Sequence, residues 1–365
     1  MFSTSRDNFE STMQALVTGS QGRIFPREQG PVEILRLELG PRQYIQEDRF
    51  HRCLVVHYRA SGLKKSMKLW LKFRPDLDIL FPMLESYHER LNGAVFPAPY
   101  FAWRSQENNM AVLATAYIRG GVLRNKLLAM SLLRQTGRLS PIFASSGAKM
   151  RRFHEAFAAT ETIGIASIID SAAELVRQTD YLSTVEKDQI LAHIAGCAAA
   201  LPMKSFPAVR NHNDWLLRNI LVTPEGTDYV IDCDSMRHRA NLRWYDVAHT
   251  LLNIESQMKW FPLITAGILS DLWRSFWQGY VRGAEIPDGL TTAQLLAILY
   301  VVRVQCLLGG TARLPYFTIM QHGLNRGFLR HLKRSIVAGK PTTLDLAWAS
   351  TSEQPALAGV GPAVA

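Results

Sequence analysis

The period of the hydrophobic pattern changes near residue 105, and this change limits the fold more than any other feature of the sequence. Between Val32 and Arg74, apolar residues come in short runs of the β type, separated by polar residues or by Gly and Pro. Such runs predict a meander of antiparallel strands. The segment 77–93 has the length and spacing of a helix that ends at Gly93, and two further runs indicate strands.

From residue 121 onward, apolar residues recur mostly at helical spacing. Helices are predicted in the segments 122–135, 145–159, 187–201, 245–257, 268–281 and 293–308. A small β-rich part therefore precedes a larger helical part, which predicts a fold of the α+β class. The final segment, 349–365, consists of small residues punctuated by Pro and Gly, and we expect it to be disordered.

Composition excludes several classes of protein. The 365 residues are 47% hydrophobic, enough for one large core or two modest ones, and carry a formal net charge of +10. This charge suggests an anionic partner: a nucleotide, a phosphorylated sugar, a nucleic acid or a membrane surface. The N-terminal stretch carries no apolar core of signal-peptide length, so export is not expected, and the apolar run Leu295–Val302 is too short to cross a bilayer. Four cysteines without CxxC spacing predict reduced thiols in a cytoplasmic protein: Cys53, Cys197, Cys233 and Cys306.

Polar side chains lie beside two short apolar runs in the middle of the chain. The motif HNDWLLRN, residues 212–219, precedes the run ILVT, and Asp232 ends the run YVID. The residues PEGT between the runs predict a β-hairpin, which would bring Asp214, Asn219 and Asp232 to one edge. Two carboxylates and an amide suit phosphoryl transfer. One carboxylate orients the acceptor hydroxyl or accepts its proton, and the other groups hold Mg²⁺ against the nucleotide phosphates. Each is also a common turn or cap residue.

HNDWLLRN resembles the catalytic loop of the protein-kinase-like superfamily, in which Asp follows His by two residues and Asn follows Asp by five. More narrowly, the chain is similar to the aminoglycoside phosphotransferase and choline kinase branch, whose loop usually reads His-Gly-Asp and precedes an Ile-Asp-x-Asp/Glu strand. IDCD matches that strand. WYDVAHTLL resembles the branch's Asp-Leu-Ala helix, and GAKMRRFHEA resembles its helix ending in Leu-His. The weaker matches extend from about residue 32 to about residue 255.

The resemblance implies a bilobal protein-kinase-like fold. We expect an N-terminal nucleotide-binding lobe over residues 1–117 and a helical C-terminal lobe over 118–348, with the catalytic loop and the acceptor pocket in the latter. The segment 349–365 is the expected tail. ATP and Mg²⁺ are the implied cofactors, and a nucleotide and a small-molecule acceptor are the implied partners. No nucleic acid is expected, and peripheral contact with a membrane remains open.

Roles in the catalytic loop carry over one residue at a time. Asp214 matches the catalytic base, and Asn219 and Asp232 match the metal ligands. For Asp234 two roles are open: it binds a second metal ion, or it is only the residue that ends the strand. His212 and Asp246 match residues that tie the loop to the core, so a structural role is expected for both.

The β-rich part supplies the candidate nucleotide-binding residues. Lys72 lies on the third predicted strand, where the family places the lysine that contacts the phosphates. Glu85 on the following helix is the expected partner of Lys72, with Glu89 as the alternative. Thr115 and Tyr117 lie in the segment that resembles the link between the lobes, where the backbone meets the nucleotide base. An exposed strand lysine and a core aromatic are the plainer readings of Lys72 and Tyr117.

Two departures from the family pattern bear on activity. Asn213 replaces the glycine of the loop, and Asn is the non-glycine residue that best tolerates a positive φ angle. No glycine-rich loop lies in the span PRQYIQEDRFHR, residues 41–52, where Arg49 or Arg52 is a candidate phosphate contact. A pseudokinase that serves as a scaffold, or binds nucleotide without phosphate transfer, is therefore the alternative to an active enzyme.

The acceptor is expected to be a small molecule. The Asp-Phe-Gly and Ala-Pro-Glu motifs of protein kinases are missing. Basic residues outnumber acidic ones after Asp234, which disfavours a polycationic aminoglycoside and favours a neutral or anionic compound that is sugar-like or glycolipid-like. A solvated basic face is the alternative explanation. The expected activity is thus an ATP-dependent phosphotransferase with an alcohol group as acceptor, while the choice between ATP and GTP and the oligomeric state are open.

Overall fold

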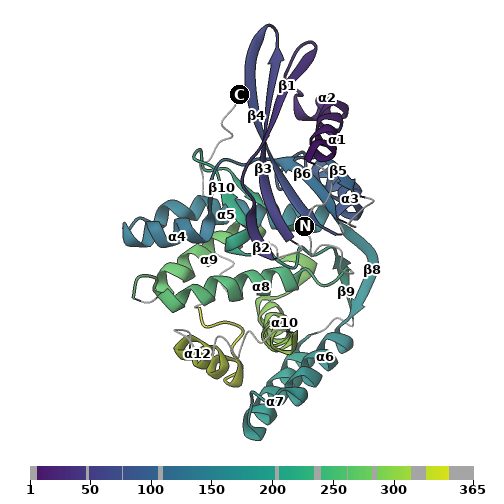
Figure 1. Ribbon diagram of the computed structural model, residues 1–365. Helices are drawn as coiled ribbons and strands as arrows, with labels where there is room; N and C mark the ends of the chain where they lie inside the picture. The colour runs from purple at the N-terminus through teal and green to yellow at the C-terminus, as the bar shows by residue number, and fades with distance from the viewer. Residues whose placement is uncertain are drawn as a thin grey trace. The chain divides into compact units, whose positions relative to one another are not determined.

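The computed structural model describes residues 6–46, 49–75, 77–105, 110–201, 205–233, 240–260, 262–281, 286–313 and 326–344 (Figure 1). The chain forms two compact units. Unit 1 contains Met1–Gly120 and Tyr229–Arg237, and unit 2 contains Gly121–Asp228 and His238–Ala365. The predicted tail, 349–365, and Asp234 lie outside the described residues.

Unit 1 is built on an antiparallel sheet in the strand order β1-β3-β4-β6-β5, with β2 paired to β3. Its strands are β1 (Val32–Leu39), β2 (Gln43–Gln46), β3 (Arg49–Ala60), β4 (Leu63–Arg74), β5 (Pro99–Arg104) and β6 (Ala111–Ala116). The β3–β4 hairpin turns at Ser61 and Gly62, which both have positive φ, as a tight two-residue turn requires. The predicted meander and the two further strands are confirmed.

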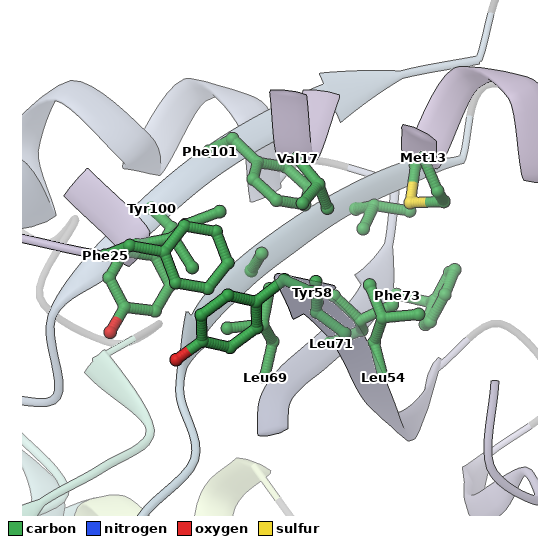
Figure 2. Packing of buried hydrophobic residues seen from close by; sticks show 14 of the residues in the cluster. Met13, Val17, Phe25, Leu54, Tyr58, Leu69, Leu71, Phe73, Tyr100 and Phe101 are labelled. Atoms are coloured by element: carbon green, nitrogen blue, oxygen red, sulfur yellow. The ribbon is translucent and has the colours of Figure 1, made fainter. Parts of the chain in front are cut away.

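One face of this sheet is covered by helices that sequence reasoning did not assign, α1 (Arg6–Gly19) and α2 (Gln21–Ile24). Met13 and Val17 of α1 pack against apolar side chains of the sheet (Figure 2). Because side chains alternate along a strand, Leu69 and Leu71 of β4 enter this core and Lys72 lies on the other face. The predicted helix is α3 (Leu77–Arg90), and Gly93 follows it with φ +65°.

Unit 2 is mainly helical, as predicted. Its helices are α4 (Leu123–Leu132), α5 (Ser140–Ala156), α6 (Ile165–Gln178), α7 (Thr184–Ala200), α8 (Trp244–Glu255), α9 (Ala266–Val281), α10 (Thr292–Arg313) and α12 (Arg326–Val337). Short 3-10 turns are η1 (Thr136–Leu139), η2 (Leu217–Asn219), η4 (Ser256–Trp260) and η5 (Pro287–Gly289). Helix α6 was not predicted. Neither was the antiparallel pair of β8 (Ala158–Gly164) and β9 (Ser205–Val209).

The strands of the predicted hairpin form at β10 (Ile220–Val222) and β11 (Asp228–Val230). The peptide N–H of Thr223 donates to the carbonyl of Thr227 over 2.8 Å and closes the turn between them. β10 also pairs with β7 (Gly121–Val122), with Leu221 opposite Val122. This pairing ties the start of unit 2 to the strand that directly follows the HNDWLLRN motif.

Helices α5 and α9 cross at unusually close range, because glycines face the partner helix from both sides. A Cβ atom added to Gly147 of α5 would collide with the carbonyl of Phe276, and one added to Gly279 of α9 would collide with the carbonyl of Ala144. The crossing brings His154 of α5 to Tyr280 of α9, where both side chains are fully buried. His154 also contacts Asp246, so the helix crossing supports the loop that carries the HNDWLLRN motif.

Helix α10 is the only helix among the described residues that is long and apolar enough to cross a membrane, over Thr292–Gly309. This window is longer than the apolar run Leu295–Val302, which by itself is too short to cross a bilayer. Inside the protein, 61% of this window is buried. Arg303 within it is 1% exposed and pairs with Glu255 of α8 at 2.9 Å. A core helix satisfies the same length and composition criteria, so α10 is weak evidence for a membrane span.

Candidate active site

The loop 210–216 leaves β9 and leads into η2, and its backbone is tied to α8. Asp246, in the first turn of α8, accepts the peptide N–H of His212 at Oδ2 and that of Asn213 at Oδ1, each over 2.7 Å. Asn211 donates its side-chain amide to the carbonyl of Leu242 over 2.7 Å. Asp246 therefore has the loop-anchoring role that the family resemblance implied.

The carboxylate of Asp246 is buried, yet it is held in the charged form. His154 Nε2 lies 3.0 Å from Asp246 Oδ2, and the Tyr280 hydroxyl lies 3.0 Å from His154 Nδ1. Burial alone would raise the pKa of Asp246, but the hydrogen bond from His154 and the nearby His212 outweigh it and lower this pKa. Burial lowers the pKa of His154. A neutral His154 thus donates to a charged Asp246, and the loop is held by charge-assisted hydrogen bonds.

Asn213 adopts φ +62°, the left-handed conformation that the family glycine would adopt with less strain. The predicted tolerance of Asn at this position is confirmed. After it, the peptide N–H of Asp214 points to Nδ1 of His212 over 3.3 Å. The buried His212 ring also meets the Trp215 ring edge-on, with 5.6 Å between centroids. His212 is thereby structural, as expected.

The carboxylate of Asp214 has a partner on each oxygen. Asn219 donates its side-chain amide to Oδ2 over 2.7 Å and to the Asp214 carbonyl over 3.0 Å. Arg218 donates to Oδ1 over 3.1 Å, although half of its own side chain is exposed. Because the amide nitrogen of Asn219 donates to Asp214, the amide oxygen is the atom that can bind a cation. The structure thus brings together the predicted base and one predicted metal ligand.

Buried contacts from neighbouring helices fix the rest of the loop. The indole N–H of Trp215 donates to Ser146 Oγ over 3.0 Å, and Thr250 Oγ donates to the Trp215 carbonyl over 2.8 Å. The peptide N–H of Leu217 donates to Asn253 Oδ1 over 2.9 Å. Because α8 satisfies backbone groups of the loop and α5 holds the Trp215 side chain, the loop presents Asp214 from a rigid frame.

Unit 1 brings the other pair of predicted residues together. Lys72 Nζ lies 2.5 Å from Asp232 Oδ1, and the lysine side chain is only 12% exposed. Asp232 follows β11 with φ +66°, a conformation that Asp tolerates better than most residues. Just before it, the peptide N–H of Val230 donates to the carbonyl of Val95 over 2.9 Å. The phosphate-binding candidate and the metal-binding candidate are therefore direct partners within unit 1.

The remaining predicted nucleotide-binding residues are also on unit 1. The carboxylate of Glu85, on α3, forms an ion pair with Arg23 of α2, so its predicted pairing with Lys72 stays a prediction. Glu89, the alternative, is exposed. Thr115 lies on β6 opposite Trp70 of β4. Tyr117 follows β6, is 39% exposed, and its ring lies 6.2 Å from that of Trp70. Contact of Thr115 and Tyr117 with a nucleotide base stays a prediction.

A basic hairpin of β2 and β3 occupies the place of the missing glycine-rich loop. The guanidinium of Arg42 lies over the ring of Phe50, 3.8 Å from its centroid. Burial and the charge of Arg42 lower the pKa of Arg52. The like charges of Arg42 and Arg52 repel each other, so a bound anion would stabilise both side chains in the described part of the hairpin. Arg49 begins β3, but its side chain is outside the described residues.

Each predicted metal ligand is an oxygen donor of the kind that suits magnesium. Among the described residues, no cluster of three or more His, Cys, Asp or Glu side chains is arranged to hold a metal ion. Mg²⁺ is usually held by one or two protein oxygens together with water and substrate phosphates. The carboxylate of Asp232 and the amide oxygen of Asn219 are donors of this kind.

Two residues near Asp214 were missed by sequence reasoning. Arg218 lies four residues after Asp214, a spacing that could have suggested the ion pair. His249 follows Asp246 by three residues on α8, and hence on the same face of the helix. It faces the backbone of Asn213, and burial lowers its pKa, whereas the charges of Asp214 and Asp246 act to raise it.

Comparison with known proteins places the chain in a family. Residues 86–286, more than half of the chain, match the model of APH, the phosphotransferase enzyme family. The chain belongs to this family. Membership confirms the predicted family and the predicted enzyme class, a phosphotransferase. No curated protein matches the sequence of this phosphotransferase.

Solved structures resemble the phosphotransferase at low sequence identity. A thermostable mutant of aminoglycoside phosphotransferase APH(4)-Ia, in a ternary complex with ADP and hygromycin B, is 14% identical with a TM-score of 0.50, covering 90% of this chain and 98% of that one. A fructosamine-3-kinase homologue from Haemophilus somnus 129PT is 12% identical with a TM-score of 0.44, covering 89% and 96%. The first likeness shows the fold and confirms the predicted α+β, protein-kinase-like class.

Proposed function

We propose that this phosphotransferase transfers the γ-phosphate of Mg·ATP to a hydroxyl group of a small, neutral or anionic acceptor that is sugar-like or glycolipid-like. The observation that carries the proposal is the Asp214 carboxylate, held by Asn219 at 2.7 Å on a loop whose backbone is fixed by Asp246. ADP in the related APH(4)-Ia structure supports a nucleotide donor. The four cysteines are free thiols, which suits the cytoplasm, where ATP is available.

Each residue has a defined task in the proposed reaction. Asp214 orients the acceptor hydroxyl and accepts its proton as the oxygen bonds to the γ-phosphorus, while the bond from that phosphorus to the bridging oxygen breaks and ADP leaves. Asn219 and Asp232 would hold Mg²⁺, which neutralises charge on the phosphates. Lys72, now paired with Asp232, would turn to the phosphates when a nucleotide and its metal arrive. Catalysis in this class of reaction comes mainly from positioning and electrostatics.

The alternative is a nucleotide-binding scaffold without phosphate transfer, and one observation favours it. No glycine-rich loop occurs in residues 41–52, the span that contains the hairpin of β2 and β3. Backbone N–H groups of such a loop cradle phosphates, and arginine side chains are a less rigid substitute. Magnesium-dependent turnover separates the two functions.

Calorimetric titration with ATP, with and without Mg²⁺, tests the proposal. We expect the wild type to bind Mg·ATP, Asp232→Ala to lose the magnesium dependence, and Asp214→Asn to keep binding while phosphate transfer falls by about 10²- to 10⁴-fold. Asp271→Ala is the matched control, because this exposed carboxylate pairs with its neighbour Arg274 on α9. Wild-type protein that binds no nucleotide would refute the proposal, and binding without transfer to any acceptor would favour the scaffold.

A further inference from the structure

The elements that surround the catalytic loop in unit 2 carry an uncompensated positive charge. Helix α4 packs against η2, and α8 packs against both η2 and η4. No carboxylate occurs on α4, η2 or η4, and together they carry four basic side chains: Arg124, Lys126, Arg218 and Lys259. The acceptor of a reaction at Asp214 would therefore meet a basic surface.

The carboxylates of the neighbouring helix α8 do not neutralise this surface. Asp246 is buried, and its carboxylate accepts hydrogen bonds from His154 and from the loop backbone. Glu255 is fully buried and serves Arg303 of α10 and the peptide N–H of Thr343. Asp214 is the only other acidic residue on the loop 210–216, α4, η2, η4 and α8, and it forms an ion pair with Arg218.

The clustered positive charge is unfavourable for the protonated form of Lys259. Its pKa is lowered by burial and by the positive charge of Arg124. Like charges in a partly desolvated place repel each other unless an anion joins them. Beside them, the indole of Trp260 is 42% exposed, with Lys259 Nζ 5.8 Å from its centroid. An exposed aromatic ring beside the Lys259 cation suits a ligand that has both a flat apolar face and an anionic group.

We propose that the acceptor carries a phosphate or carboxylate group, which binds Arg218, Arg124 and Lys259 while its hydroxyl meets Asp214. This inference rests on the proposed function and narrows its acceptor to an anion. Arg218 has a double effect, because its guanidinium, 3.1 Å from Asp214, attracts an anionic acceptor and repels a cationic one. Trp260 packs against the ring of the acceptor.

Binding of matched sugars tests the inference. The probes are glucose 6-phosphate, glucuronate, glucose and glucosamine, each titrated into the full-length protein with Mg²⁺ and a non-hydrolysable ATP analogue. We expect the two anionic sugars to bind at least about tenfold more tightly than glucose, and glucosamine to bind most weakly, since hydrogen bonds between oppositely charged groups are stronger than those between neutral groups. The phosphate and carboxylate arms distinguish the two anionic groups.

Variants connect the preference to the residues. Arg218→Gln and Lys259→Gln should each weaken binding of the preferred anionic sugar by about tenfold, a larger loss than either causes for glucose. Arg274→Gln, which removes an exposed charge from α9, is the control and should change neither. No preference for anions in the wild type, a preference for glucosamine, or an anion preference that survives both substitutions would overturn the inference.

The same samples separate this inference from the proposed function. Binding of Mg·ATP by the wild type, measured without any sugar, reports on the proposed function alone. If nucleotide binds and anionic sugars show no advantage, the phosphotransferase proposal stands and the anionic acceptor fails. If nucleotide does not bind while anionic sugars still bind through Arg218, the basic surface is an anion site and the proposed function fails.

Discussion

At the scale of single residues, Asn213 gives the sharpest prediction. Its φ of +62° suits Gly and Asn and strains a β-branched residue. We therefore expect Asn213→Gly to keep kcat/KM within about twofold and Asn213→Val to lower it by at least about tenfold, since left-handed strain costs about 1–2 kcal/mol and displaces Asp214. Steady-state kinetics of phosphate transfer check this. Equal activity of both variants would show that the backbone conformation at Asn213 does not matter.

Residue roles that depend on nearby sequence were predictable, and those that depend on distant partners were not. The positive φ of Asn213 and the anchoring role of Asp246 followed from the pattern of the motif. The ion pair of Glu85 with Arg23 did not, because Arg23 lies on a short helix that the hydrophobic pattern failed to reveal. Arg218 was overlooked beside Asp214, although a spacing of four residues allowed the contact.

At the scale of elements, the crossing of α5 and α9 depends on two glycines that face the partner's backbone. We expect Gly147→Ala and Gly279→Ala each to lower the free energy of unfolding by about 3 kcal/mol, because the new methyl group meets a carbonyl rather than a movable side chain. Gly196→Ala in α7 is the control. It has no atom within 4 Å of the added methyl and should stabilise the helix by about 1 kcal/mol. Urea titrations measure all three, and a neutral Gly147→Ala would mean that the helices can separate freely.

The elements that were predicted have strong, local patterns. The β3–β4 hairpin and helices α8 and α9 have periodic apolar residues, and α10 contains a long apolar run. Helix α1 was missed because its narrow apolar stripe, which includes Met13 and Val17, lies among polar side chains and gains stability mainly from the sheet it packs against. Strands β8 and β9 lie far apart in sequence, so only their pairing makes them strands.

At the scale of the whole molecule, the net charge of +10 is informative only once burial is known. The sequence shows more basic than acidic residues after Asp234, but it does not show which of them reach solvent. The structure buries Glu255 with Arg303 and Asp288 with Arg243, so these pairs cancel internally. What remains accessible near the catalytic loop is basic, which is the basis for an anionic acceptor.

Burial of histidines gives the molecule a pH dependence of stability. The pKa of His249 is held below its ordinary value of 6.5 by burial, even though Asp214 and Asp246 act against this shift and Arg218 assists it. A lowered folded-state pKa means that the unfolded chain binds the proton more readily. The stability that a neutral His249 contributes is therefore fully present above pH 6.5 and is lost as the pH falls from 6.5 toward the lower folded-state pKa.

Comparing the wild type with His249→Gln isolates this contribution, since every other titrating group is common to both proteins. We expect the free energy of unfolding of the wild type to fall more steeply than that of the variant between pH 7 and pH 5, with the difference in slope at most about 1.4 kcal/mol per pH unit. Urea titrations at pH 7.5, 6.5 and 5.5 measure both slopes. Parallel slopes would place His249 in water in the folded protein, and a steeper slope for the variant would reverse the sign of its pKa shift.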